Sequence, residues 1–214
     1  MDHAATTPVD PLVLEAMMPF FSDKFGNAST LYAQGREGRE AVSSAREQVA
    51  NAIGAEPEEI VFTSGGTESN NMVLLGTMPY FARAHLVTSV IEHPAVLGPV
   101  RVLEKRGIGV ARVNTGESGR VDPDSVKDVC VPETRLISLM LANNETGVIQ
   151  PVEDVAGFAR SRGILVHTDA AQAVGKIPVN VEELGVDYLT VAGHKLYAPK
   201  GVGALYIRDG APLE

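Results

Sequence analysis

Cysteine and tryptophan are almost missing from this chain of 214 residues, which contains one cysteine, Cys130, and no tryptophan. A lone cysteine excludes an internal disulfide and any cluster of thiolates around zinc or iron and sulfur. Aromatic residues make up only 5% of the chain, whereas glycines number 21. This balance favours binding sites lined by backbone over pockets walled by aromatic rings.

Basic charge and long apolar runs are scarce as well. Eighteen Lys and Arg against 27 Asp and Glu give a net charge of −9, which makes long nucleic-acid backbones poor partners. No stretch approaches the ~18 uninterrupted apolar residues of a membrane helix, and we expect no secretion signal. With 44% hydrophobic residues the composition is typical of globular proteins. We therefore expect a cytoplasmic protein that contacts no membrane.

Apolar segments alternate with helical patterns along most of the chain. Runs rich in Val, Ile and Leu predict seven strands, at 59–63, 85–90, 109–113, 136–141, 164–168, 187–191 and 203–207. Between strands, stripes with a 3.6-residue period end at glycines; they are Val42/Ala45/Val49/Ile53, Val96/Leu97/Val100/Leu103 and Val152/Val155/Ala156/Ala159. This alternation predicts one α/β domain over residues 1–214, with a mostly parallel seven-stranded sheet and helices on both faces.

Polar clusters follow five of the predicted strands. In parallel sheets, ligands bind at the carboxyl ends of the strands, where these clusters would gather at one rim. The clusters are Ser64–Ser69, Glu92–Pro94, Asn143–Gly147, Asp169–Gln172 and Gly193–Lys195. Their convergence predicts a binding or catalytic site at that rim.

The loop from Ser64 to Ser69 offers a site for an anion. Gly65 and Gly66 let the backbone approach a ligand closely, and free N–H groups at a helix start favour a phosphate. The spacing matches neither a Walker loop nor a dinucleotide-binding loop. The alternative is a tight turn in which Thr67 or Ser64 caps an ordinary helix.

Asp169 and Lys195 each follow an apolar run and would lie at the ends of buried strands. A buried carboxylate needs a partner, which a protonated ring nitrogen or an arginine could supply. Desolvation of a lysine lowers its pKa and frees the amine for Schiff-base chemistry. Gln172 shares a face with Asp169 if a helical turn begins there. The alternatives are a cap with a surface amide for Asp169 and Gln172, and a solvated lysine for Lys195.

His93 and the pair Asn143-Asn144 complete the candidates. A neutral imidazole at a strand end can stack on a ring or carry protons, and the amides can donate hydrogen bonds toward the rim. A structural histidine and turn-forming asparagines are the alternatives. The segment Gly107-Ile108-Gly109 precedes a strand, so it is interpreted as a helix terminator and not as a nucleotide-binding loop.

Six motifs occur in one order along the chain: Asp2-His3-Ala4-Ala5-Thr6-Thr7-Pro8, Thr63-Ser64-Gly65-Gly66-Thr67-Glu68-Ser69-Asn70, Glu92-His93, Asn143-Asn144-Glu145-Thr146-Gly147, His167-Thr168-Asp169-Ala170-Ala171-Gln172 and Gly193-His194-Lys195. Together they resemble the cysteine desulfurase and selenocysteine lyase family, which belongs to the class V aminotransferase-like pyridoxal-phosphate enzymes. The resemblance extends from residue 2 to about Arg208.

The resemblance implies that pyridoxal 5'-phosphate is the cofactor and that matching residues contact its ring. Lys195 would bind it covalently and shuttle the substrate α-proton, and Asp169 would pair with the pyridinium nitrogen. Gln172 would donate a hydrogen bond to the ring's phenolic oxygen, and Asn144 would lie near that oxygen and the substrate. His93 would stack on the ring and transfer protons.

The resemblance also implies a phosphate site and a reaction. Gly66, Thr67 and His194 would hold the phosphate, while Ala192 stands where many members have a phosphate-binding serine, so one hydrogen bond is expected to be lost. The reaction would be C–S or C–Se cleavage of L-cysteine or L-selenocysteine. It would give alanine plus sulfane sulfur or selenium, which an acceptor protein would receive.

The family carries its sulfur-accepting cysteine in a C-terminal small domain, which would lie beyond Glu214. The substrate-carboxylate arginine, and a phosphate contact from the partner subunit of a homodimer, would lie there too. Cys130 matches no catalytic position and is expected to be a packing residue. We therefore expect this chain alone to be inactive. The alternatives are a catalytically silent binding or scaffold module and a class V aminotransferase or lyase that needs no cysteine.

Overall fold

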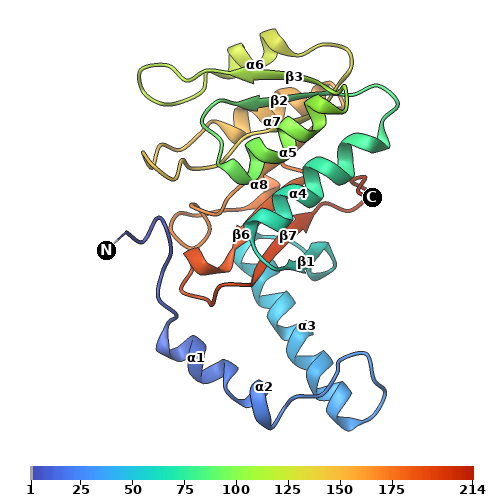
Figure 1. Cartoon of the computed structure of the whole chain (residues 1–214), viewed down its shortest axis with the longest axis vertical. Helices are drawn as coiled ribbons and strands as arrows, with labels where there is room; N and C mark the ends of the chain where they lie inside the picture. Colours follow the sequence, from blue (N-terminus) through green and yellow to red (C-terminus); the bar gives the residue numbers. More distant parts are fainter. Residues whose placement is uncertain (1) are drawn as a thin grey trace.

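The computed structural model describes residues 2–214, which contain a seven-stranded sheet (Figure 1). The strands lie side by side in the order β1 (Ile60–Thr63), β7 (Gly203–Ile207), β6 (Tyr188–Ala192), β5 (Leu165–Asp169), β4 (Thr134–Ser138), β2 (His85–Ser89) and β3 (Gly109–Val113). Neighbouring strands are parallel except at β7, which runs antiparallel to both β1 and β6. The prediction of a mostly parallel sheet is therefore confirmed.

Helices cover both faces of this sheet. One face is covered by α4 (Gly66–Thr77) and α5 (Pro94–Lys105). The other is covered by the end of α3 (Ala33–Ile53) and by α6 (Pro123–Val129), α7 (Val152–Ser161) and α8 (Val181–Leu184). Short 3₁₀ helices complete the turns: η1 (Pro57–Glu59), η2 (Met78–Tyr80) and η3 (Gly193–Lys195).

Successive residues of each strand belong to opposite hydrophobic cores, because side chains alternate across a strand. Leu136 and Tyr188 lie in the core beneath α4 and α5, whereas Ile137 and Leu189 lie in the core on the other face. All four side chains are at most 1% exposed. This two-sided burial explains why the strands are continuous apolar runs in the sequence.

Five predicted strands differ from the observed ones at their ends. The prediction of a strand over 136–141 is wrong at both ends, since β4 spans Thr134–Ser138. One reason is that the backbone N–H of Met140 donates to the Glu92 carboxylate. The strand predicted at 164–168 corresponds to β5. It begins one residue later, because the backbone N–H of Ile164 donates to the backbone oxygen of Ala159 in the turn that ends α7. The strand predicted at 59–63 begins one residue later, the one predicted at 85–90 ends one residue earlier, and the one predicted at 187–191 lies one residue later.

The N-terminal helices extend away from the sheet (Figure 1). Neither α1 (Pro11–Met17) nor α2 (Pro19–Ser22) contains a buried residue. The predicted stripe on α3 is buried only at its end, around Ile53, whereas Val42 is 43% exposed. Other exposed large apolar side chains of this region are Leu12, Leu14, Met18, Phe20, Phe21, Phe25, Leu31 and Tyr32. Within residues 2–214, no helix is both long and apolar enough to cross a bilayer.

Candidate active site

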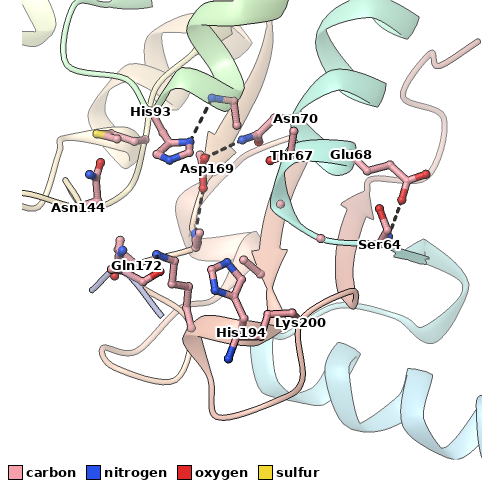
Figure 2. Close-up of a pocket in the computed structure, with 18 of the residues that line it drawn as sticks. Ser64, Thr67, Glu68, Asn70, His93, Asn144, Asp169, Gln172, His194 and Lys200 are labelled. Carbon is pink, nitrogen blue, oxygen red and sulfur yellow. Dashed lines mark hydrogen bonds between the residues drawn. The ribbon is translucent and has the colours of Figure 1, made fainter. Parts of the chain in front are cut away.

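A cavity of about 370 Å³ lies at the carboxyl ends of the parallel strands (Figure 2). The loops after β1, β2, β4, β5 and β6 all contribute to its lining. The structure brings together here all eight residues that the sequence singled out: Gly66, Thr67, His93, Asn144, Asp169, Gln172, His194 and Lys195. The edge of the sheet at which the sequence predicted a site therefore contains a cavity.

The turn between β1 and α4 provides an uncapped helix start. Gly65 is the N-cap residue of α4, has a φ of 147° and has no side chain with which to cap the first turn. A Cβ on Gly66 would lie 3.3 Å from the Cβ of Ala192, so the helix start lies close against β6. The first N–H groups of a helix lack intrahelical partners and carry partial positive charge. This end of the cavity therefore suits an anion.

Asp169 ends β5 as a nearly buried carboxylate that is 7% exposed. Its Oδ2 accepts a hydrogen bond of 2.7 Å from Asn70 Nδ2, and its Oδ1 accepts one of 3.0 Å from Ala171 N. Burial raises the pKa of Asp169, and these two hydrogen bonds and the nearby His93 and Lys195 oppose the rise. The carboxylate still has free lone pairs for a cationic group in the cavity.

Lys195, in η3 after β6, lies beneath the N-terminal segment. Its Nζ donates hydrogen bonds to the backbone oxygens of Ala4 and Ala5, the latter at 2.7 Å. Gln172 Nε2 donates to Ala4 O at 2.8 Å, so residues 4 and 5 hold both cavity side chains. Burial lowers the pKa of Lys195, while Asp2 and Asp169 act in the opposite direction. A lowered pKa increases the fraction of neutral, nucleophilic amine.

Two histidines lie at the cavity on separate elements (Figure 2). His93 is the N-cap residue of α5, and its Nδ1 accepts a 3.1 Å hydrogen bond from Ala95 N, so the proton of the neutral ring is on Nε2. His194 Nδ1 lies 3.2 Å from Thr6 Oγ1. Burial, and then the charge of Lys195, lower the pKa of His194. Both rings therefore have a nitrogen without a partner among these contacts.

The structure separates the roles of Asn143 and Asn144. Asn143 Oδ1 accepts hydrogen bonds from Glu145 N, Thr146 N and Thr146 Oγ1, which is the turn-forming alternative. Asn144 lines the cavity instead, and its Nδ2 donates to Glu145 Oε1 at 2.7 Å. Of the pair, only Asn144 is therefore available to a ligand.

Sequence reasoning missed Glu92, which is 4% exposed and has no assigned role in the motifs. Its Oε1 accepts a 2.6 Å hydrogen bond from Ser89 Oγ, and both of its carboxylate oxygens lie 3.1 Å from Met140 N. Burial, with a smaller contribution from the charge of the nearby Asp169, raises the pKa of Glu92 to about 8. Glu92 is thus a neutral acid that joins the ends of β2 and β4. In the sequence, the only indication of a role for Glu92 is its position beside His93.

His167 is another buried polar group that the sequence did not explain. It is fully buried, with Nδ1 2.9 Å from Ser138 Oγ and Nε2 3.1 Å from Thr190 Oγ1. Burial lowers its pKa to about 3, so the ring is neutral at physiological pH. It joins β4, β5 and β6 through hydroxyl groups, two residues before Asp169. Its role is to hold these strand ends in register.

Cys130 lies away from the cavity. It is the C-cap residue of α6, before the start of β4, and its Sγ donates to Val126 O at 3.2 Å. Burial raises the pKa of the thiol, which disfavours the reactive thiolate. The expectation that it is a packing residue fits its contact with the hydrophobic core. Residues 2–214 contain no group of three or more His, Cys, Asp or Glu side chains that could hold a metal ion.

The comparisons with known proteins agree with one another. A family model described as aminotransferase class-V matches residues 1–212. Two curated relatives named cysteine desulfurase IscS are 51% identical over 100% of this chain (Dictyoglomus turgidum) and 49% identical over 97% of it (Anaeromyxobacter dehalogenans). The matches cover 55% and 52% of those proteins, so the chain spans about half the length of the curated relatives it matches.

Solved structures share the fold. The structure of SspA in complex with cysteine superposes with a TM-score of 0.95 at 42% identity, over 97% of this chain and 60% of that one. A NifS-like protein superposes with a TM-score of 0.97 at 41% identity, over 100% of this chain and 60% of that one. Since the family model runs along nearly all of its length, the chain belongs to the aminotransferase class-V family.

Proposed function

We propose that residues 1–214 form the cofactor-binding domain of a pyridoxal-phosphate-dependent cysteine desulfurase. One observation carries the proposal: the nearly buried Asp169 carboxylate and the Lys195 amine line the same cavity as the uncapped start of α4. The names of the curated relatives, and the complex of SspA with cysteine, support cysteine as the substrate. Selenocysteine would present the same chemistry with selenium in place of sulfur.

The donor set of the cavity fits the cofactor at three points. A carboxylate suits its protonated ring nitrogen, a helix start suits its phosphate, and a partly desolvated amine suits its aldehyde. Gly65 supports this fit, because a Cβ built on it would meet no atom within 4 Å, so the space beside the helix start is open. When bound, pyridoxal phosphate withdraws electrons from the substrate's α-carbon and thereby allows the C–S bond to break.

In this proposal each residue at the strand ends has its own role. Asp169 would hold the ring nitrogen, Gln172 and Asn144 would donate hydrogen bonds at the phenolic oxygen, and His93 would stack on the ring and transfer protons through Nε2. Lys195 must first release the carbonyls of Ala4 and Ala5, and its neutral amine then carries the substrate α-proton.

The phosphate and the partners complete the proposal. Gly66, Thr67 and His194 bind the phosphate, with the backbone N–H groups of α4 as the main donors. Sulfur passes as sulfane sulfur to an acceptor protein, in the manner required for iron–sulfur cluster assembly. The active species is a cytoplasmic homodimer of the longer protein.

The proposed function is tested by titrating the purified chain with pyridoxal phosphate and then with L-cysteine. We expect a new near-ultraviolet or visible absorption band that changes when L-cysteine is added. We expect no alanine from residues 1–214 alone, because Cys130 lies before the amino end of β4, away from the cavity. A chain that gains no band would contradict the proposal. Alanine release at about 1 s⁻¹, an ordinary turnover, would show that the reaction needs no further thiol.

Asp169→Asn is expected to weaken cofactor binding roughly 10- to 150-fold. A hydrogen bond to a charged group contributes about 1.5–3 kcal/mol, and the amide cannot form an ion pair with the ring nitrogen. Equilibrium dialysis with pyridoxal phosphate measures the change. Asp154→Asn, on the surface of α7, is the control and should bind the cofactor as the wild type does. Equal affinity of all three proteins for pyridoxal phosphate would show that Asp169 does not contact the cofactor.

A further inference from the structure

Asn70, on the second turn of α4, is a buried amide with a single side-chain partner among residues 2–214. It is 1% exposed, and its Nδ2 donates a 2.7 Å hydrogen bond to Asp169 Oδ2 (Figure 2). Its Oδ1 is also buried and accepts no hydrogen bond from the described residues. An unsatisfied buried oxygen costs free energy, so the amide is not explained by the stability of the helix.

The next residue, Asn71, provides the internal comparison. Its Nδ2 donates to Thr67 O within the same helix, at the surface. Val73 and Leu74, the next residues toward the core, are apolar and fully buried. Asn70 lies one turn before these two residues and is almost as buried as they are, yet within the described part of the chain its side chain makes a single hydrogen bond, to the Asp169 carboxylate.

We propose that Asn70 is a positioning residue that orients the Asp169 carboxylate and favours its ionised form, and so sets how strongly the site holds a protonated ring nitrogen. The ligand in this inference rests on the proposed function. Asn70 Nδ2 holds Oδ2 and Ala171 N holds Oδ1, so the carboxylate cannot rotate without losing a donor. The hydrogen bond from Asn70 also lowers the pKa of Asp169, against the rise that burial causes.

The test compares two cofactors in three proteins. The cofactors are pyridoxal phosphate and its 1-deaza analogue, in which carbon replaces the ring nitrogen. The proteins are the wild type, Asn70→Leu, which keeps the branching at Cγ but removes the donor, and Asn71→Leu as the matched control. Dissociation constants come from equilibrium dialysis, which needs no turnover.

We expect Asn70→Leu to weaken pyridoxal phosphate about tenfold, the equivalent of one hydrogen bond to a charged group. Binding of the deaza analogue should change less than about twofold, because it has no ring nitrogen for Asp169 to hold. Asn71→Leu should leave both constants unchanged. If Asn70→Leu does not fold, as judged by circular dichroism, Asn70→Ala is measured in the same way.

Two outcomes overturn the inference. An equal loss for both cofactors would show that Asn70 supports the structure only, and no loss for either would show that it does not act on Asp169. A different result is expected if the proposed function itself is wrong. In that case the wild type would bind both cofactors with equal affinity, or would bind neither.

Discussion

Lys195→Gln is expected to abolish covalent attachment of pyridoxal phosphate, whereas Lys200→Gln should leave it intact. Both lysines line the cavity, but their surroundings differ. Burial lowers the pKa of Lys195 and favours its neutral amine, which is the form that reacts with an aldehyde. Lys200 is exposed, and within residues 2–214 its amine donates one hydrogen bond, of 3.3 Å, to Thr7 O. The two variants therefore separate chemistry at one amine from general attraction of a phosphate to positive charge.

The measurement is borohydride reduction of the protein–cofactor mixture, followed by digestion and mass spectrometry of the peptides. In the wild type and in Lys200→Gln we expect a single modified lysine, Lys195. In Lys195→Gln we expect no specific modification, although the phosphate site still binds the cofactor reversibly. Modification on Lys200, or spread over surface lysines in the wild type, would remove Lys195 from its proposed role.

Glu92→Gln is expected to change how the stability of the protein depends on pH. The pKa of Glu92 is about 8 in the folded state and 4.5 in its ordinary state, so the folded protein binds the proton more tightly. Its contribution to stability is fully present below pH 4.5 and is lost as the pH rises toward 8. The slope reaches about 1.4 kcal/mol per pH unit, which sums to the order of 4 kcal/mol at pH 8.

The glutamine variant cannot ionise, so it should escape this loss. We expect wild type and Glu92→Gln to differ little at pH 4.5 and the variant to become more stable as the pH rises, by urea unfolding at several pH values. His167, with its pKa lowered to about 3, has the opposite effect below pH 6.5, but it is present in both proteins and cancels in the difference. Glu117→Gln, on the surface, is the control. Parallel profiles for wild type and Glu92→Gln would contradict a neutral buried Glu92.

The local chemistry of the sequence was enough to predict the sheet and the rim. Strands such as β4 and β6 are buried on both faces, and this leaves a run of apolar residues that a sequence displays directly. Gly54 ends α3 in the left-handed conformation, with a φ of 69°, as its position after the apolar stripe predicted. Because polar residues followed strand after strand, the gathering of Asp169, Gln172 and Lys195 at one edge could also be predicted.

What the sequence could not decide depends on partners that are far apart along the chain. Asn70 meets Asp169 across 99 residues, Glu92 meets Met140 across 48, and Lys195 meets Ala4 across 191. In their local sequence Asn70 and Asn71 are equivalent, only the family resemblance favoured Asn144 over Asn143, and nothing local distinguishes a neutral glutamate from a charged one. Burial and hydrogen-bond partners determine these properties, and both exist only once the strands and helices pack. The sequence by itself thus determined which residues gather at the cavity, and the tertiary structure decided their protonation states and which of them are free to bind a ligand.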